Sequence, residues 1–127
     1  MAISLELVQP AAGELRDLAP MIHRQRLVME GTPRAAIDDA QIRTYLRGLS
    51  DVCAMHVLIE PVTHRSDRFG WAGWVHWETS GAHFYAWEDP LLFFSVDVYT
   101  CKPFSPPAAM AYTSRFFGAS QLVARSF

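Results

Sequence analysis

A serine and a histidine interrupt a run of aromatic residues in the segment WETSGAHFYAWEDP, from Trp77 to Pro90. A serine hydroxyl becomes a nucleophile when a neighbouring group removes its proton, and Ser80 has the residue type for that chemistry. A serine followed by glycine, as in Ser80-Gly81, is also typical of a tight turn between two strands. The residues alone leave both interpretations open.

The chain has two thiols, Cys53 and Cys101. A free cysteine is most often a small buried side chain, and two distant thiols predict neither a disulfide framework nor a zinc site. His56, His64 and His76 share no ligand spacing with cysteines or carboxylates. We therefore expect reduced thiols and no bound metal.

Length and composition place the chain among globular proteins. Its 127 residues suit one domain, and 50% of them are apolar while 19% are charged, which excludes a disordered or fibrous chain. The formal charge of -2 gives no electrostatic reason for binding nucleic acid or an anionic membrane. Neither a signal peptide nor an apolar run of about 18 residues is recognisable, so we expect a cytoplasmic protein.

The first third of the chain predicts one strand followed by two helices. Apolar and polar residues alternate over residues 3–8, which predicts a strand that ends at Pro10. Apolar residues at helical spacing predict an inserted helix within residues 11–31. Thr32 and Pro33 then suit the N-cap and first position of a second helix.

The rest of the second helix and the following strands complete the predicted fold. The second helix carries an apolar stripe at i, i+3, i+4 and i+7, namely Ile42, Tyr45, Leu46 and Leu49. From Val52 onward the period changes to two, which predicts strands. They cover residues 53–62, 71–78, 82–87, 93–101 and 120–126. A last helix begins at Pro106 and ends at Gly118.

This pattern predicts an α/β (α+β) two-layer sandwich, an antiparallel β-sheet with helices on one face. In WAGWVHW, residues 71–77, both faces of the strand are substantially apolar. Helices cover only one face, and a large exposed aromatic patch is unusual in a monomer. We therefore expect a homodimer formed through the sheet face.

The second half of the chain resembles the prokaryotic S-adenosylmethionine decarboxylases, pyruvoyl-dependent enzymes of polyamine (spermidine) biosynthesis. The resemblance rests on five short motifs in the family's order. They are HR at 64–65, GWAG at 70–73, ETS at 78–80, YAWED at 85–89 and DVYTC at 97–101. A helix started by prolines follows, as in the family. The resemblance implies the family's fold over a single domain, residues 1–127, with the extra helix around 11–31 as an insertion.

The resemblance also implies a role for each matched residue. Ser80 aligns with the pyruvoyl precursor, so the chain is expected to cleave itself between Thr79 and Ser80. The ketone formed from Ser80 accepts the amine of S-adenosylmethionine and serves as the electron sink for decarboxylation. Cys101 aligns with the proton donor. Trp87 and the adjacent Glu88 or Asp89 align with a turn of the family whose acid is a candidate for binding the ribose hydroxyls of the substrate.

The chain departs from the family where the serine is activated. Where the family has a glutamate before the reactive serine this chain has Thr79, and where the family has a histidine that helps self-cleavage and catalysis this chain has Tyr85. An assisting serine of the family is Ala72. His83 lies two positions before Tyr85 on the same face of a strand, so His83 is the imidazole expected to stand in.

These departures leave three alternatives open. In a shifted register Thr79, not Ser80, is the attacking residue. A second alternative is a decarboxylase of a different amino acid. The third is an unprocessed, non-catalytic homologue that binds a nucleoside or amino acid ligand.

Overall fold

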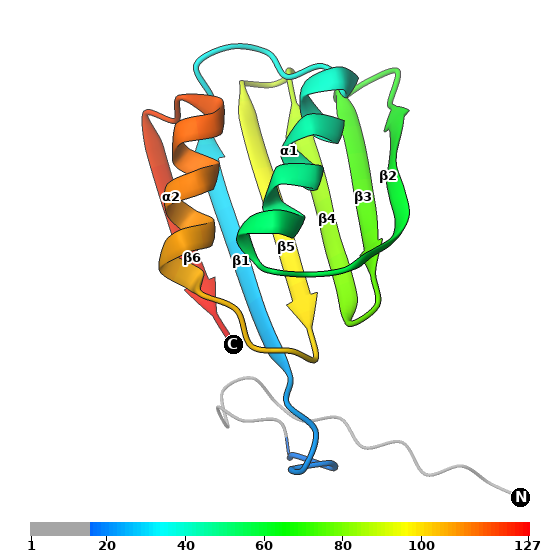
Figure 1. Ribbon diagram of the computed structural model, residues 1–127. Helices are drawn as coiled ribbons and strands as arrows, with labels where there is room; N and C mark the ends of the chain where they lie inside the picture. The colour runs from blue at the N-terminus through cyan, green and yellow to red at the C-terminus, as the bar shows by residue number, and fades with distance from the viewer. Residues whose placement is uncertain (1–15) are drawn as a thin grey trace, which may run out of the picture.

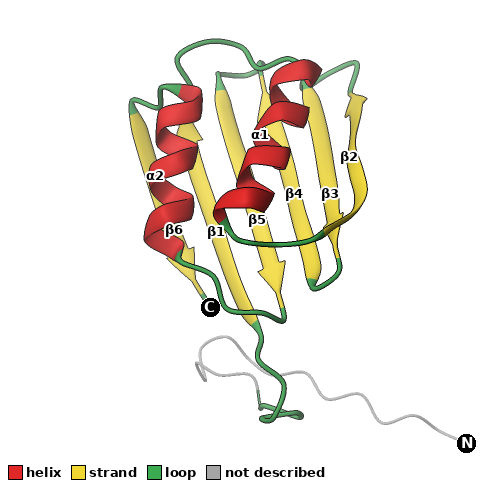
Figure 2. Cartoon of the chain, viewed as in Figure 1, coloured by secondary structure: helices red, strands yellow, loops and turns green. Residues whose placement is uncertain are grey.

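The computed structural model describes residues 16–127, and this part of the chain forms one six-stranded antiparallel sheet and two helices (Figure 1). The elements are β1 (Gln25–Thr32), α1 (Asp39–Val52), β2 (Val57–Arg65), β3 (Trp71–Trp77), β4 (Ser80–Trp87), β5 (Phe93–Thr100), α2 (Pro106–Phe117) and β6 (Gln121–Ser126). The strand order is β2-β3-β4-β5-β1-β6, and both helices cover the same face (Figure 2). The predicted two-layer α+β sandwich is confirmed.

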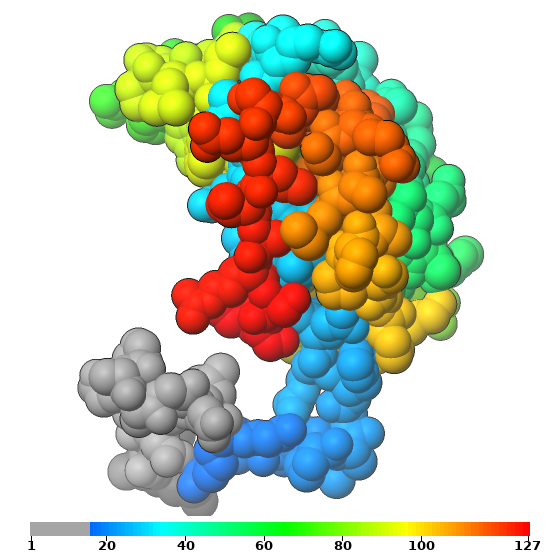
Figure 3. All heavy atoms as spheres, turned by 90° about the vertical axis from the view of Figure 1, so that its left-hand side faces the viewer, coloured from blue at the N-terminus to red at the C-terminus, as the bar shows by residue number. Residues whose placement is uncertain are grey.

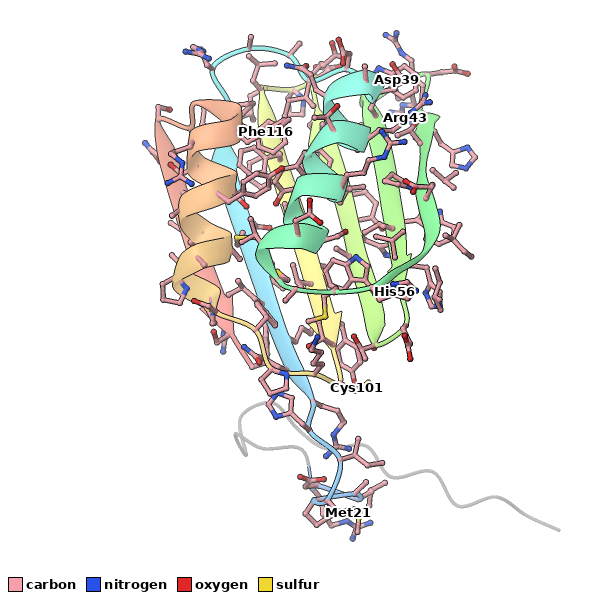
Figure 4. All side chains as sticks on the ribbon, in the orientation of Figure 1. Met21, Asp39, Arg43, His56, Cys101 and Phe116 are labelled. Atoms are coloured by element: carbon pink, nitrogen blue, oxygen red, sulfur yellow. The ribbon has the colours of Figure 1, made fainter. Side chains whose placement is uncertain are left out.

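The core lies between the helices and the covered face of the sheet. Every second residue of the central strands is buried, as Val96 and Val98 are in β5. The predicted stripe of α1 is fully buried on the sheet. Between the helices, the Tyr45 ring of α1 lies 5.4 Å, centroid to centroid, from Phe116 of α2. Figure 4 shows Phe116 between the two helices.

Helix α1 begins later than the sequence predicted. Its N-cap is Asp38, whose side chain accepts a hydrogen bond from the backbone N–H of Gln41, while the Gln41 side chain accepts one from the N–H of Asp38. The expected start at Thr32 and Pro33 was wrong, because Thr32 is the last residue of β1 and pairs with Gln121 of β6. The reciprocal cap at Asp38 is the stronger helix start.

The predicted helical insertion over residues 11–31 was wrong for the residues that the structure describes. Residues 16–24 form turns and irregular backbone, and residues 25–31 belong to β1. This strand lies between β5 and β6, and its Leu27 and Met29 side chains are buried beneath the helices. Pairing on both edges outweighs local helical spacing here. The strand predicted over 3–8 lies outside the described residues.

The remaining boundaries agree with the sequence more closely. Strand β2 is shifted toward the C-terminus of the predicted 53–62, and β4 begins at Ser80, two residues early. Helix α2 begins after its N-cap Ser105 and ends at Gly118, which has a φ of 55° as a left-handed C-cap. With 14 and 12 residues, neither helix of the described chain reaches the roughly 20 residues of a membrane span.

The other face of the sheet carries no helix. Figure 3 views the molecule along the sheet from the β6 side, with α2 on one side of β6 and a hollow on the other. The outward-pointing residues of β3, β4 and β5 include aromatic, charged and small side chains, and we call this side of the sheet the open face. Its exposed aromatic side chains include Tyr85 on β4 and Tyr99 on β5, which are 43% and 44% exposed.

Candidate functional site

A two-residue turn, Glu78-Thr79, joins β3 to β4 and places Ser80 at its end. Ser80 pairs with Trp77 across the hairpin and has a φ of 116°, a conformation that residues with a side chain rarely adopt. Such a conformation costs on the order of 1–3 kcal/mol unless the surroundings enforce it. Ser80 is therefore both the closing residue of a hairpin and a strained residue beside the Thr79 carbonyl.

The end of β5 lies against this turn. Ser80 pairs with Thr100, and the backbone N–H of Cys101 donates a hydrogen bond to the carbonyl oxygen of Thr79, with an N···O distance of 3.0 Å. An N–H aimed at a carbonyl oxygen stabilises negative charge that develops there when a nucleophile attacks the carbonyl carbon. The structure thus brings together three of the residues predicted from the sequence.

The loop after α1 braces the hairpin from the other side. The backbone N–H of Glu78 donates to the His56 carbonyl at 2.9 Å, and the Thr79 hydroxyl donates to the Met55 sulfur at 3.2 Å. Lys102 Nζ donates to the Ala54 carbonyl at 2.6 Å, which ties the segment of Cys101 to the same loop. Figure 4 shows Cys101 and His56 in the lower half of the molecule. The turn is held from two elements distant in sequence.

A groove of about 450 Å³ opens on the open face beside Ser80. Its floor is Gly81, which lies between His76 of β3 and Tyr99 of β5 in one cross-strand row. A Cβ at position 81 would lie 2.4 Å from the Val75 carbonyl oxygen, so the site excludes any larger residue. The groove is open at this position because Gly81 has no side chain.

An ion pair closes one side of the groove. Arg26 of β1 donates two hydrogen bonds to Asp97 of β5, with Nε···Oδ1 at 2.9 Å and Nη2···Oδ2 at 2.6 Å. These bonds raise the pKa of Arg26. The sequence predicts a helix over this segment and so does not indicate Arg26, which the structure places in β1. Alternation in DVYTC, which points Asp97 and Tyr99 to one face, was the signal for the rest of this wall.

His83 and Tyr85 lie along β4 on the open face. His83 and Ser80 both line the groove. The His83 ring packs edge to face on Tyr85, with 6.2 Å between ring centroids. Tyr85 lies outside the groove.

The residues expected to bind the ribose lie at the other end of β4. Trp87 packs on Phe93 at 5.3 Å between centroids, and the backbone N–H of Glu88 donates to the Phe69 carbonyl. Trp87 lies seven positions after Ser80 along β4, a span of about 23 Å at about 3.3 Å per residue. Asp89 lies two residues further on and is exposed. The structure does not bring this group to Ser80 within one chain.

The sequence of this chain matches one known protein family over most of its length. Residues 28–127 match the family model described as S-adenosylmethionine decarboxylase. The chain belongs to the S-adenosylmethionine decarboxylase family. The match begins inside β1 and runs to the last residue of the chain.

A solved structure of the family has the same fold. The crystal structure of the adenosylmethionine decarboxylase from Aquifex aeolicus VF5 superposes with a TM-score of 0.68 over 84% of this chain and 89% of that chain. The two sequences are 17% identical, so the likeness concerns the fold. No curated protein matches the sequence of this chain.

The two cysteines differ in environment. Cys53 is buried, and burial raises the pKa of its thiol to about 12, which keeps it protonated and unreactive. Cys101 is exposed beside Ser80. Of the two thiols, Cys101 is the exposed one and lies next to the strand end that pairs with Ser80. Within residues 16–127, no three His, Cys, Asp or Glu side chains gather to hold a metal.

Decarboxylases of this family depend on a pyruvoyl group. The residues around Ser80 fit the formation of such a group, because the carbonyl before the serine is already hydrogen-bonded and the backbone is strained. The groove at Gly81 leaves room beside it.

Proposed function

We propose that the chain is a pyruvoyl-dependent decarboxylase of S-adenosylmethionine that acts in spermidine biosynthesis in the cytoplasm, after cleaving itself between Thr79 and Ser80. The observation that carries the proposal is the hydrogen bond from the Cys101 N–H to the Thr79 carbonyl oxygen, next to a strained serine. That arrangement lowers the energy of attack on one peptide bond. Membership of the family supports the reaction and its substrate.

The cleavage begins with an acyl shift. Ser80 Oγ bonds to the Thr79 carbonyl carbon, the C–N bond to Ser80 breaks, and the serine proton ends on the released amine. The Cys101 N–H stabilises the oxyanion formed between these events. Elimination of the Thr79 carboxylate, addition of water and loss of ammonia leave the new group on residue 80.

The groove supplies the binding surface for the substrate. The pyruvoyl group contributes an electron sink for the carbon that loses carbon dioxide. The Cys101 thiol donates a proton to that carbon afterwards. The aromatic faces of Trp74 and Tyr99, which line the groove, suit a nucleoside base and a sulfonium cation.

A homodimer through the open face completes the proposal. The open face carries exposed aromatic side chains, and the Trp87 end of β4 lies too far from Ser80 to share a site within one chain. Two copies packed face to face about a two-fold axis perpendicular to the strands would place the Trp87 end of one protomer over the Ser80 end of the other. Trp87, Glu88 and Asp89 would then reach the substrate.

Intact-mass spectrometry tests the cleavage. Purified protein is expected to give two species, residues 1–79 ending in threonine and residues 80–127 beginning with a pyruvoyl group. Hydroxylamine traps the ester intermediate and yields the same cut with serine at the new N-terminus. The cleaved protein should release carbon dioxide from S-adenosylmethionine. A single species of 14.3 kDa with and without hydroxylamine would contradict the proposal and favour an unprocessed ligand-binding homologue.

Replacing Cys101 with alanine is expected to separate cleavage from catalysis. The backbone N–H that holds Thr79 remains in Cys101→Ala, so the chain should still be cut. Without the thiol, turnover should fall by about 10²–10⁴-fold, the usual contribution of a positioned proton donor. Mass spectrometry and carbon dioxide release report the two steps on one sample. Cys53→Ala is the matched control, and full turnover in Cys101→Ala would contradict the assignment.

A further inference from the structure

Residues 16–24, which we call the arm, extend below the sheet from the start of β1 (Figure 1). The segment that matches the family model begins at residue 28, so the arm lies outside it. Three large apolar side chains of the arm are exposed, namely Leu18 at 78%, Met21 at 83% and Ile22 at 51%. Figure 4 shows Met21 away from the sheet and both helices. Such a group of neighbouring apolar side chains is typical of a protein contact.

The arm is folded on itself and tied to the body of the molecule. The Asp17 carboxylate accepts hydrogen bonds from the Arg24 guanidinium and from the Ala19 N–H, the latter at 2.9 Å. At the base of the arm, the Gln25 side chain donates to the Phe104 carbonyl at 3.0 Å and accepts from the Phe104 N–H at 3.2 Å. The exposed apolar side chains therefore belong to a braced turn.

The arm also borders the groove beside Ser80. A hollow of about 560 Å³ lies between the arm and the open face. Arg26 and Tyr99 line both this hollow and the groove, so they form a common wall. A protein that packs on the arm would therefore also cover one end of the groove.

The turn between β4 and β5, residues 88–92, lies at the opposite end of the sheet and complements the arm. Its Leu91 side chain is 57% exposed. The turn carries two carboxylates, Glu88 and Asp89, and no cationic residue, whereas the arm carries two arginines and one aspartate. Figure 3 shows the turn (yellow-green) above the hollow of the open face and the arm (blue) below it, both extending to the open side.

The symmetry of the proposed homodimer brings these two ends together. A two-fold axis between the sheets, perpendicular to the strands, reverses the strand direction of the second copy and leaves like strands opposite each other. The arm, which leads into β1, then faces the end of β1 in the second copy. There Gly31 pairs with Phe94 of β5, directly after the β4–β5 turn. Arm and turn both project into the roughly 10 Å that separate packed sheets.

From these observations we propose that the arm of each protomer clasps the β4–β5 turn of a second copy of the chain, an inference that rests on the proposed function. The three apolar side chains of the arm cover Leu91 of the second copy. The net positive charge of the arm lies beside the carboxylates of Glu88 and Asp89. Because the arm borders the groove of its own chain, the clasp also closes that end of the groove.

Cysteine cross-linking between two kinds of full-length chain tests the contact. One chain carries Met21→Cys and the other carries Leu91→Cys with a histidine tag, so that the two differ in mass. Both also carry Cys101→Ala, which removes the exposed native thiol. Oxidation of the co-expressed chains should join the Met21→Cys chain to the Leu91→Cys chain, and peptide mass mapping should identify the linked pair. No single chain contains both cysteines, so this link forms only between copies.

Ala111→Cys is the matched control for Leu91→Cys, because Ala111 is exposed on α2, on the helix-covered side. The clasp is overturned, and the decarboxylase proposal stands, if the protein is a dimer in which Met21→Cys joins Leu91→Cys no better than Ala111→Cys. A protein that is monomeric at every concentration would overturn the clasp and the proposed homodimer together. The intact-mass measurement of cleavage tests the rest of the proposed function separately.

The dimer dissociation constant gives a second test. Replacing Leu18, Met21 and Ile22 together with serine should raise this constant about tenfold or more, because a few buried side chains carry most of the energy of an interface. Leu91→Ser should act in the same way, and the combined variant should show less than the product of the two effects. Val52→Ser, on the helix side, should leave the constant unchanged. Effects that multiply in full would show that arm and turn do not touch.

Discussion

Replacing Ser80 with glycine is expected to block cleavage and to yield a more stable fold than replacing it with alanine. Both variants remove the hydroxyl, so each should remain a single 14.3 kDa chain. Glycine adopts a φ of 116° readily, whereas alanine keeps the strain of about 1–3 kcal/mol. Glycine also loses more backbone entropy on folding, about 0.5–1 kcal/mol, so the net gain should be near 1 kcal/mol.

Urea unfolding of the two uncleaved variants measures this difference directly. Ser80→Gly should unfold at a higher urea concentration than Ser80→Ala with an unchanged slope. Equal midpoints would show that position 80 stores no strain. A cut that persists in both variants would indicate that Thr79 is the attacking residue, and adding Thr79→Val should then remove it.

Trp77→Ala is expected to cause the largest loss of stability among single substitutions near the site. The Trp77 side chain is 0% exposed, and its Nε1 donates to Ser50 Oγ at 2.7 Å. Ser50 in turn donates to the Leu46 carbonyl at 2.7 Å, which links the end of β3 to α1. Truncating a buried tryptophan costs about 3–5 kcal/mol through lost burial and the cavity that remains. The whole free energy of unfolding of a typical domain is only about 5–15 kcal/mol.

The measurement is urea unfolding in the uncleaved Ser80→Ala background, so that chain fragments do not contribute. Trp74→Ala is the matched control, because Trp74 lies on the same strand, is half-buried and faces the open side. Trp74→Ala should lower the free energy of unfolding clearly less than Trp77→Ala does. Equal losses from the two substitutions would show that the open face is as important to the folded chain as the core.

Periodicity predicted most of the fold after residue 39 because each of those elements is locally consistent. The stripe of α1, the alternation in β3 and the Pro106 start of α2 all agree with their tertiary contacts. In strand β1 the local sequence pattern does not agree with the tertiary structure. Its alternation of Leu27 and Met29 is short, and only pairing with β5 and β6 makes it a strand. That pairing is not visible locally.

The candidate site was also predictable in part, because some of its residues lie in short local motifs. The order of short motifs led to Thr79, Ser80 and Cys101, which the register of β4 and β5 brings together. No local pattern indicated that a backbone N–H, rather than a side chain, would bind the Thr79 carbonyl. The partnership of Arg26 with Asp97 joins residues 71 positions apart and required the three-dimensional structure.

The strand order has a consequence for the cleaved protein. A cut after Thr79 leaves β1, α1, β2 and β3 in one fragment and β4, β5, α2 and β6 in the other. Because β1 lies between β5 and β6, the two fragments interdigitate within one sheet, joined at β3–β4, β5–β1 and β1–β6. Neither fragment can leave without breaking the sheet. After such a cut the protein would therefore behave as one particle whose two fragments separate only on unfolding.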